Sequence, residues 1–537
     1  MNALLCRAAV LSIVLAEMLS AKVLDGYFSI DELNQRCEAL ARAHPQLVRV
    51  DTLARTPGGR PVLRLRIGRS DDLPAMLLIG GAEGDDLASP QVCLGFAERL
   101  LFSDRLAVLQ DAAMFIIPCL NVDAAASAFT ASPRWNRCTN DRAVDDDHDG
   151  ETDEDGYEDL NGDGLITLMR VAGAGEWLED QECPPLLRRA DADKGEVGNW
   201  RLYGEGLDND RDGRWNEDPP GGVDLNRNFS YRYRYFAEAA GDDPLSEPES
   251  RALADFLIAH SNIFAAFSFS SADNLLHPWQ GKAAEKGKPL QQPLLEDAPI
   301  FSRVAERFKQ AGVLPLWPER QAERGNPAEW LYYHLGFWSF FAPVWLPPAD
   351  SSRKAESEQD LERGLFAWYR AQGMADRFIP WQKISHPDFP DREVQVGGWA
   401  PFARKNPPVD SLKAVTDRYF RFWMELMESR PRLELALKAE RMDAGLYRLT
   451  ATLRNRGSLP TSSAVGDQIR RGPRLKIEIV SERIRLTAGK RFYLLEPLPA
   501  GGETEKSWML TGKAGETVKV KAVIPAAGEA TASATLR

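Results

Sequence analysis

Three stretches of the chain carry oxygen-bearing side chains at the same spacing. They read DDDHDGETDED (145–155), DLNGDGLITLMR (159–170) and DNDRDGRWNED (208–218), and each has such residues at positions 1, 3 and 5 and a glycine at position 6. This is the oxygen spacing of an EF-hand-type calcium loop, in which the glycine permits a sharp turn. The predicted calcium ligands are Asp145, Asp147, Asp149 and Asp153 in the first loop, Asp159, Asn161 and Asp163 in the second, and Asp208, Asp210 and Asp212 in the third.

One feature of an EF-hand is missing from all three loops. The bidentate glutamate of position 12 is absent, and those positions hold Gly156, Arg170 and Pro219. Carboxylates shortly before them are alternative sources of oxygen: Glu154, Asp155, Glu217 and Asp218. A solvated acidic loop explains any one of these stretches, but three in one register, in a segment that otherwise repels itself, favour a cation. We therefore expect structural calcium that folds this segment.

A second candidate site is GGVDLNRNFS (221–230), where Asn226 and Arg227 follow two glycines in a turn-like stretch. The planar guanidinium of an arginine makes two parallel hydrogen bonds to a carboxylate. An asparagine beside it adds a neutral donor and acceptor. Taken alone, the stretch is better explained by a surface arginine in a polar loop.

The negative charge of the chain is concentrated around the calcium-like loops. The formal charge of the 537 residues is −13 at pH 7, whereas residues 141–218 alone hold 25 Asp and Glu against 8 Lys and Arg. The remainder is weakly positive, and because it has no basic stripe or RNA motif we expect no nucleic acid partner. The hydrophobic content of 44% is that of a globular protein, and the length predicts two or more domains.

The N-terminal 21 residues have the pattern of a secretory signal peptide. Arg7 precedes a mostly apolar run that Glu17 interrupts, and small residues follow at Ser20 and Ala21. A buried N-terminal helix is the alternative. We predict a secreted or periplasmic protein without a membrane span, because neither this run nor any later segment is long enough to cross a bilayer. In an oxidising compartment, the two cysteines that flank part of the acidic segment are candidates for a disulfide, Cys138 and Cys183.

The chain between residues 25 and 430 alternates the patterns of strands and helices. Strands are predicted at 62–68, 75–81, 113–120, 263–270 and 336–346. Helices are predicted at 29–44, 89–102, 246–260, 298–312 and 410–429. Ser29, Ser89 and Ser246 are the expected caps of the first three helices. This order predicts an α/β fold with a mixed sheet flanked by helices.

From about residue 431 the pattern changes to apolar and polar residues that alternate, with Gly, Pro and Asn between the runs. Such runs predict an all-β sandwich that supports or docks. The predicted domains are therefore a signal peptide (1–21), an α/β domain (22–430) with the acidic insertion (141–220), and a C-terminal β-sandwich (431–537).

Four motifs of the α/β part resemble those of the zinc metallocarboxypeptidases of the carboxypeptidase A-like family. GVDLNRNF (222–229) is close to the family's motif before a central strand, and IIPCLNVD (116–123) stands where the family has Pro-x-x-Asn-Pro-Asp-Gly. FSFSSADNLLHPW (267–279) resembles the strand that ends in the last zinc histidine, and EWLYYHLGFWSFFAPVW (329–345) the strand of the catalytic glutamate. The resemblance covers roughly residues 25–400 and implies the family's fold. It also implies that Asn226 and Arg227 grip the C-terminal carboxylate of a peptide.

The same resemblance places other residues where the family's catalytic groups stand. The family holds zinc with two histidines and a glutamate, and a second glutamate moves the proton of the zinc-bound water. Here Glu83 and Asp86 stand at the His-x-x-Glu positions, Ser270 at the last histidine and Pro343 at the catalytic glutamate. Hard oxygen ligands suit Ca²⁺, Mg²⁺ or Mn²⁺ better than Zn²⁺, and Glu83 and Asp86 are equally explained as carboxylates that line a cleft. We do not expect zinc.

The oxyanion-stabilising arginine of the family is also replaced. Asn136 stands at its place, with Arg134 and Arg137 as alternative candidates nearby. The favoured function is that of an exported, catalytically inactive carboxypeptidase-like protein that binds a peptide or protein C-terminus. One alternative is an active metallocarboxypeptidase with atypical metal ligands. Another is a structural envelope protein whose cleft has no ligand.

Overall fold

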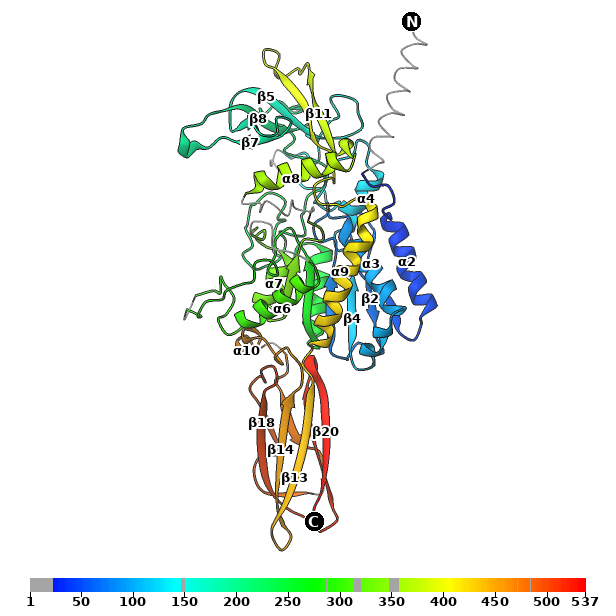
Figure 1. Cartoon of the computed structure of the whole chain (residues 1–537), viewed down its shortest axis with the longest axis vertical. Coiled ribbons are helices and arrows are strands. Elements are labelled where there is room, and N and C mark those ends of the chain that lie inside the picture. The colour runs from blue at the N-terminus through cyan, green and yellow to red at the C-terminus, as the bar shows by residue number, and fades with distance from the viewer. Residues whose placement is uncertain are drawn as a thin grey trace.

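The computed structural model of the chain describes residues 23–145, 150–285, 288–312, 320–346, 357–470, 472–482 and 484–537. These residues form an α/β body, a second sheet at one end of it and an elongated β-sandwich at the other end (Figure 1). The fold class is the predicted one: a mixed sheet flanked by helices, with a C-terminal all-β part. The predicted signal peptide (1–21) lies outside the described residues.

The body is built on a six-stranded mixed sheet. Its strand order is β1-β2-β4-β3-β9-β10. The strands are β1 Val48–Arg55, β2 Pro61–Ile67, β3 Ala75–Ile79, β4 Ala113–Ile117, β9 Ile263–Phe269 and β10 Trp338–Ala342. The last four run parallel to one another, whereas β1 and β2 pair antiparallel to their neighbours. All four parallel strands are buried along their whole length, as expected for strands that are covered on both faces.

Helices cover both faces of this sheet. The described helices are α2 Ile30–Ala43, α3 Ala88–Leu101, α4 Val122–Thr130, α5 Pro248–Ala259, α6 Ala298–Gln310, α7 Pro327–Tyr333, α8 Glu358–Ala371, α9 Val409–Glu428 and α10 Ala464–Gln468. Of these, α8 lies beside the second sheet and α10 at the junction with the sandwich, not on the body sheet. Trp423 of α9 packs against Phe267 of β9, and α3 and α6 contact the same helix. Phe256 of α5 packs against Phe115 of β4. The strand register puts Phe115 and Phe267 on opposite faces, so α5 and α9 enclose the sheet between them.

Two of the three predicted helix caps are wrong. Ser29 forms the expected capping box at the start of α2. Ser89 does not cap α3, because Asn406 from a distant loop accepts hydrogen bonds from the preceding backbone and the helix already begins at Ala88. In α5 the cap position belongs to Glu247, since Pro248 occupies the first turn and fixes where the helix starts.

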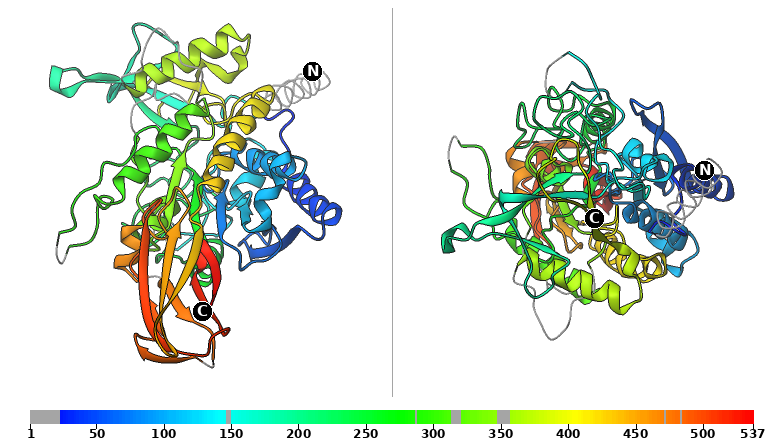
Figure 2. Two further views of the ribbon diagram at one scale, coloured as in Figure 1. Left: turned by 60° about the horizontal axis from the view of Figure 1, so that its bottom comes forward. Right: turned by 90° about the horizontal axis from the view of Figure 1, so that it is seen from above.

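The second sheet joins the acidic insertion to a segment far along the chain. Its order is β11-β12-β5-β8-β6-β7, and neighbouring strands run antiparallel. The strands are β5 Leu168–Gly175, β6 Trp177–Glu179, β7 Leu187–Arg189, β8 Gly198–Gly204, β11 Phe378–Ile384 and β12 Val394–Trp399. Val394 lies opposite Val171, and Val396 opposite Met169, and the four side chains form a small core of their own. Figure 2 shows this sheet and α8 at the end of the body away from the sandwich.

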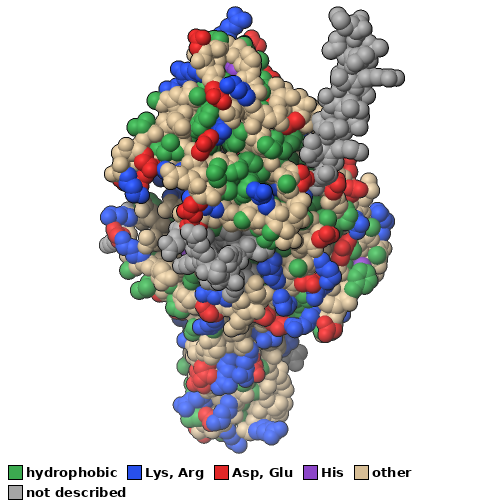
Figure 3. Space-filling view, turned by 45° about the horizontal axis from the view of Figure 1, so that its top comes forward, with side chains coloured by type: hydrophobic (Ala, Val, Ile, Leu, Met, Phe, Trp, Pro, Cys, Tyr) green, Lys and Arg blue, Asp and Glu red, His purple; other side chains and the backbone are tan. Residues whose placement is uncertain are grey.

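The C-terminal part consists of two four-stranded antiparallel sheets, β13-β14-β18-β16 and β17-β15-β19-β20. The strands are β13 Leu433–Asp443, β14 Leu446–Asn455, β15 Lys476–Ile479, β16 Arg485–Ala488, β17 Phe492–Leu494, β18 Glu503–Thr511, β19 Thr517–Ile524 and β20 Gly528–Thr535. Side chains of β14 and β19 alternate between buried and exposed positions, and the buried ones form a separate core. Side chains of both charges are intermixed on the face of the sandwich that Figure 3 shows.

The body and the sandwich meet in a close backbone contact. A Cβ atom at Gly336 would lie 2.3 Å from the Cα of Gly466 in α10. The Ser463 hydroxyl donates to the carbonyl of Gly336 at 2.7 Å, and the backbone N–H of Ala464 donates to Asp297 at 2.8 Å. A small cavity of about 70 Å³ lies at the same junction.

Two further expectations have different outcomes. None of the helices in the described ranges combines the length and the apolar character needed to span a bilayer. The disulfide between Cys138 and Cys183 is not formed, and both are free thiols. They belong to different parts of the fold: Cys183 packs beside Leu186 and Phe366, whereas the backbone of Cys138 lies against Gly84 in the body.

Candidate functional site

The carboxyl ends of three parallel strands meet at one edge of the body sheet. The chain leaves β3 toward Glu83, β9 toward Ser270 and β10 toward Pro343. Because β3, β9 and β10 are neighbours in the sheet, these residues come together although they are far apart in the sequence. In open α/β sheets, ligands bind outside the carboxyl ends of the strands. All three residues line one cavity of about 700 Å³.

The cavity has an apolar side and an acidic side. Val344, Trp345, Leu361 and Phe402 supply apolar surface. The ionisable residues that line it are Glu83, Asp85, Asp86, Asp273, Arg320, Glu323, Glu358, Glu362, Arg404 and Lys405. Seven acidic groups stand against three basic ones in this lining.

Glu83 accepts hydrogen bonds from four neutral donors around it. Its oxygens accept from the Ser271 backbone at 2.7 Å, from Asn226 Nδ2 at 3.4 Å, from the Ser270 hydroxyl at 3.3 Å and from the Ser271 hydroxyl. Burial alone would raise the pKa of Glu83, but the Lys405 ammonium and the Ser271 donors outweigh it and hold the pKa below its usual value. Glu83 is therefore a carboxylate with all its acceptor capacity in use.

Lys405 supplies the positive charge at this place. Its Nζ lies 3.0 Å from Glu83 Oε2 and 2.6 Å from Asp85 Oδ1. Burial would lower the pKa of Lys405, but Asp85 and Glu83 outweigh that effect and hold it well above the usual value. The ammonium is thus permanently charged and bridges two carboxylates at the carboxyl end of β3.

Asn406 fixes the loop that delivers this lysine. Its Oδ1 accepts from the backbone N–H groups of Leu87 and Ala88 at 2.7 and 3.0 Å, and its Nδ2 donates to the carbonyls of Asp85 and Phe402. The loop after β12 is therefore tied to the start of α3. Sequence reasoning missed Lys405, because 322 residues separate it from Glu83 and no local pattern marks it.

Asp86 stands apart from the ion pair. It is buried and accepts a hydrogen bond from the backbone N–H of Ser89 at 2.9 Å. Burial raises the pKa of Asp86 to about 7, and the Glu83 carboxylate adds to the effect. At neutral pH this carboxyl group is therefore partly protonated.

The donor set of this cavity does not fit zinc. Among the described lining residues there is no histidine or cysteine. Glu83 and Asp85 are already ion-paired with Lys405, and the Ser270 hydroxyl donates to Glu83. His277 hydrogen-bonds Asp273 at 3.1 Å but does not line the cavity. Tetrahedral zinc takes nitrogen, sulfur and free carboxylate ligands, and the groups that lie here are committed to other partners.

Pro343 and Asn136 lie where the resemblance expects a glutamate and an arginine. Both line the cavity. Pro343 has no ionisable group, and its carbonyl accepts from the Tyr419 hydroxyl at 2.6 Å. Asn136 Oδ1 accepts from the backbone N–H of Phe402 at 2.6 Å. Both side chains thus belong to the wall of the cavity.

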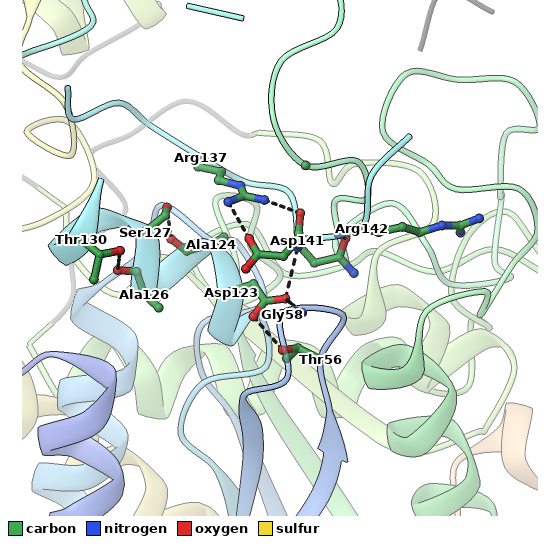
Figure 4. Close-up of polar contacts among 12 residues, drawn as sticks. Thr56, Gly58, Asp123, Ala124, Ala126, Ser127, Thr130, Arg137, Asp141 and Arg142 are labelled. Atoms are coloured by element: carbon green, nitrogen blue, oxygen red, sulfur yellow. Dashed lines mark hydrogen bonds and ion pairs between the residues drawn. The ribbon is translucent and has the colours of Figure 1, made fainter. Parts of the chain in front are cut away.

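The alternative arginines do not take over the oxyanion role. Figure 4 shows the guanidinium of Arg137 directed at Asp141, with an Nη1–Oδ1 distance of 2.6 Å. Its Nη2 donates to the carbonyl of Asn140 at 2.6 Å. Neither Arg134 nor Arg137 is among the residues that line the cavity.

Only one of the two predicted carboxylate-binding residues faces the cavity. Asn226 is buried, lines the cavity and donates to Glu83. Arg227 lies beside it: its Nη1 donates to the carbonyl of Glu238 at 3.1 Å, and its Nε is 3.5 Å from Asp224 and 3.9 Å from Glu323. Because Glu323 lines the cavity, Arg227 lies next to its rim rather than inside it.

The calcium-like loops share one backbone geometry. In each loop the aspartate of position 1 accepts a hydrogen bond from the glycine N–H of position 6: Asp145 from Gly150 at 3.0 Å, Asp159 from Gly164 at 2.7 Å and Asp208 from Gly213 at 3.1 Å. All three glycines have positive φ angles, of 105°, 82° and 95°, which only glycine adopts without strain. The common register predicted from the sequence is therefore present in the structure.

At the third loop, carboxylates from two segments of the chain lie close together. Oxygens of Asp208, Asp210 and Asp212 lie within 4.8 Å of one another, and so do those of Asp155, Asp210 and Glu217. Burial, together with the carboxylates of Asp155 and Asp212, raises the pKa of Glu217 to about 7. The earlier alternative, in which Asp155 and Glu217 supply extra oxygens, matches this arrangement.

The other predicted ligands are less gathered. Asp147 and Asp149 lie outside the described residues. Asp153 accepts from the backbone N–H of Gly221. In the second loop Asp159 accepts only backbone hydrogen bonds, and Asn161 Nδ2 donates to Asp163 at 3.1 Å.

Comparisons with known proteins give two family matches. A family model described as zinc carboxypeptidase matches residues 33–159 and 200–338, and one described as a domain of unknown function matches residues 432–535. The first model thus skips residues 160–199, about half of the acidic insertion. No curated protein sequence matches the chain.

Solved structures with similarity to the chain are metallocarboxypeptidases. Bovine thrombin-activatable fibrinolysis inhibitor in complex with tick carboxypeptidase inhibitor is 15% identical, with 75% of this chain and 97% of that chain covered and a TM-score of 0.40. Carboxypeptidase A from Helicoverpa armigera is 14% identical, with 68% and 80% covered and a TM-score of 0.39. The metallo-carboxypeptidase of Pseudomonas aeruginosa is 12% identical, with 74% and 69% covered and a TM-score of 0.34.

Proposed function

Because the α/β domain of this chain belongs to the zinc carboxypeptidase family, we propose that it binds the C-terminus of a peptide or protein without cleaving it. Asn226 and Arg227 receive the terminal carboxylate, and the cavity takes the last side chain. The single observation that carries the proposal is the cluster of Glu83, Lys405 and Asn226. Glu83 stands at one of the family's metal-ligand positions but pairs with Lys405, and it lies next to Asn226 of the carboxylate clamp, as we call Asn226 and Arg227.

The absence of cleavage follows from the groups that zinc peptidases need. A zinc-bound water and a carboxylate base are both required for hydrolysis of this type. Glu83 is engaged with Lys405, and Pro343 carries no proton acceptor. The alternative of an active metallocarboxypeptidase needs a metal that displaces Lys405 and a base from elsewhere in the lining.

Arg227 must change partners when the ligand binds. In the free protein its guanidinium donates to a backbone carbonyl and lies near Asp224 and Glu323. A terminal carboxylate offers it two parallel charge-assisted hydrogen bonds, which are stronger than the long contacts it has now. Burial raises the pKa of Asp224 to about 7, so this neighbour competes only weakly near neutral pH.

Binding of fluorescent peptides to the full chain tests the proposal. A peptide with a free C-terminus is expected to bind, and its C-terminal amide to bind at least about 10-fold more weakly, since a hydrogen bond to a charged group contributes about 1.5–3 kcal/mol. Arg227→Ala is expected to cause the same loss, whereas Arg234→Ala, an exposed arginine of the same segment, is the matched control. Equal affinity for acid and amide contradicts the clamp, and release of the terminal residue establishes the peptidase alternative.

Calcium is the cofactor we propose for the insertion. The carboxylates around Asp210 converge from two segments, and six or more oxygens around a flexible loop are what Ca²⁺ takes. The ion offsets their mutual repulsion and fixes the loops beside the second sheet. For residues 1–21 we retain the proposal of a signal peptide and hence a secreted or periplasmic location; the N-terminal sequence of the mature protein checks it.

A further inference from the structure

We infer that Lys405 is the resident cation of the cavity, so that its ammonium neutralises Glu83 and Asp85 in place of a divalent ion. The inference deepens the proposed function, on whose zinc-free cavity it rests. It names the group that balances the carboxylates and predicts that the intact protein keeps divalent metals out.

The geometry of the cluster supports this role. The ammonium lies within hydrogen-bond distance of one oxygen from each carboxylate, at 3.0 and 2.6 Å. The other donors to Glu83 are neutral: a backbone N–H, an amide and two hydroxyl groups. Among the described residues, Lys405 is therefore the cation that balances the charge of Glu83 and Asp85.

The loop around Lys405 holds the lysine in place. Asn406 is buried and makes four hydrogen bonds, two of them to the backbone at the start of α3. The same asparagine binds the carbonyl of Asp85, so the carboxylate and the ammonium are attached to one anchor. The backbone on both sides of the ion pair is therefore held in place, although, within the described part of the chain, the Lys405 side chain itself is fixed only by its two carboxylate partners.

The cluster also reaches the peptide clamp. Glu83 Oε1 accepts from Asn226 Nδ2 while Glu83 Oε2 accepts from Lys405. Lys405 thus orients Asn226 through Glu83, and it acts as a positioning residue rather than as a contact to the ligand.

Manganese binding tests the inference in the full chain with saturating calcium, which fills the acidic loops. Lys405→Ala removes the ammonium and leaves two carboxylates of a kind that Mn²⁺ accepts. Lys413→Ala, a lysine with an 87% exposed side chain on α9, is the matched control. We expect Lys405→Ala to retain about one more divalent ion per chain, counted as calcium plus manganese, than the wild type or the control after desalting, since both ions bind such oxygen ligands.

Thermal melting gives a second readout. Lys405→Ala is expected to melt lower than the control by about 3 °C, because removal of one partner leaves unbalanced charge. Either Mn²⁺ or n-butylammonium ions should restore the melting temperature, whereas sodium chloride at the same ionic strength should not. Recovery by the alkylammonium ion would identify an ammonium as the cation that the cavity needs.

Two outcomes overturn the inference. One is equal calcium-plus-manganese content in Lys405→Ala and the control, with no response of Lys405→Ala to either cation; the other is manganese retained by the wild type in saturating calcium and lost on Glu83→Gln, which means that a metal displaces the lysine. If Lys405→Ala does not fold, the neutral variant Glu83→Gln/Asp85→Asn/Lys405→Met decides. It should fold and ignore both cations, and its failure to fold would show that Lys405 acts through packing. These readouts involve no peptide, so the inference and the proposed clamp fail separately.

Discussion

Single carboxyl groups in this protein differ in how their charge is stabilised. Glu83 and Glu249 are both buried. The first has a lysine and four neutral donors, and the surroundings lower its pKa. The second has one oxygen without a hydrogen-bond partner among the described residues, and burial, with Glu247 and Asp123 nearby, raises its pKa to about 7. The neighbours of Glu83 thus stabilise its charged form, whereas the surroundings of Glu249 destabilise its charged form.

Glu249→Gln should stabilise the protein at alkaline pH. The folded state holds the proton of Glu249 up to about pH 7, whereas the unfolded state releases it near 4.5, the ordinary pKa of a glutamate. The wild type therefore loses stability as the pH rises between these values, by about 1–3 kcal/mol in all. Melting temperatures at pH 4.5 and pH 8 should show a gain for Glu249→Gln only at pH 8.

Glu247→Gln is the control for that experiment. Glu247 accepts from Arg142, Ser246 and Asn140, so its amide should lower the melting temperature at both pH values. A pH-independent difference between Glu249→Gln and the wild type would contradict the assignment of Glu249 as a strained buried acid.

The residues of the candidate site were only partly predictable from the sequence. Glu83, Ser270 and Pro343 were found through the resemblance to the zinc carboxypeptidases, and the structure brings them together at one sheet edge. Lys405 was not found, since it comes from a loop with no periodic pattern, and its partners Glu83 and Asp85 are more than 300 residues away in the sequence. The orientation of Arg227 also depends on tertiary neighbours, Glu238 and Glu323.

At the level of elements, the strands and helices of the body were predictable because their apolar residues repeat at strand or helix spacing. The starts of α3 and α5 were not, since Asn406 and Pro248 override the local serine caps. The second sheet was not predicted at all. Its strand β5 pairs with β12, which lies in a segment more than 200 residues away.

Asp210→Asn should remove most of the stabilisation by calcium. Asp210 belongs to both groups of converging carboxylates in the third loop. Calcium at 100 times its dissociation constant contributes about 2.7 kcal/mol to stability, so the melting temperature of the wild type should rise on addition of calcium after chelation. Asp193→Asn, an exposed acid of the same insertion, should keep this rise. If the wild type does not respond to calcium, the insertion is a solvated acidic loop.

At the level of the whole molecule, the body and the sandwich are joined through close backbone contacts, to which Arg303 of α6 adds a hydrogen bond to the carbonyl of Ser458. Gly336 and Gly466 allow the two backbone segments to approach each other closely. Asp297 of the body accepts hydrogen bonds from backbone N–H groups of α10. This close approach of the body to the sandwich is made at Gly336, Gly466 and Asp297. The sandwich is therefore a fixed extension of the body and not a module on a loose linker.

Gly336→Ala should separate the two parts. The new Cβ would lie 2.3 Å from Gly466, and the φ angle of +66° adds strain. Gly373→Ala has nearly the same φ angle, +73°, but nothing within 4 Å of the new Cβ. We expect Gly336→Ala to melt about 2–4 °C below Gly373→Ala and to be cleaved faster by protease near residues 430–432. Equal melting of the two variants would argue against a tight junction.

The pairing of β5 with β12 has a consequence for the way the chain is made. Arg170 and its partner Gln395 are 225 residues apart, which corresponds to roughly 10–45 s of synthesis at about 5–20 residues per second. During that time β5 can pair with β8 but exposes its other edge, and an open strand edge is a template for aggregation. The calcium-like loops and strands β5 and β8 are thus synthesised long before β12. Until β12 has left the ribosome, the second sheet is incomplete.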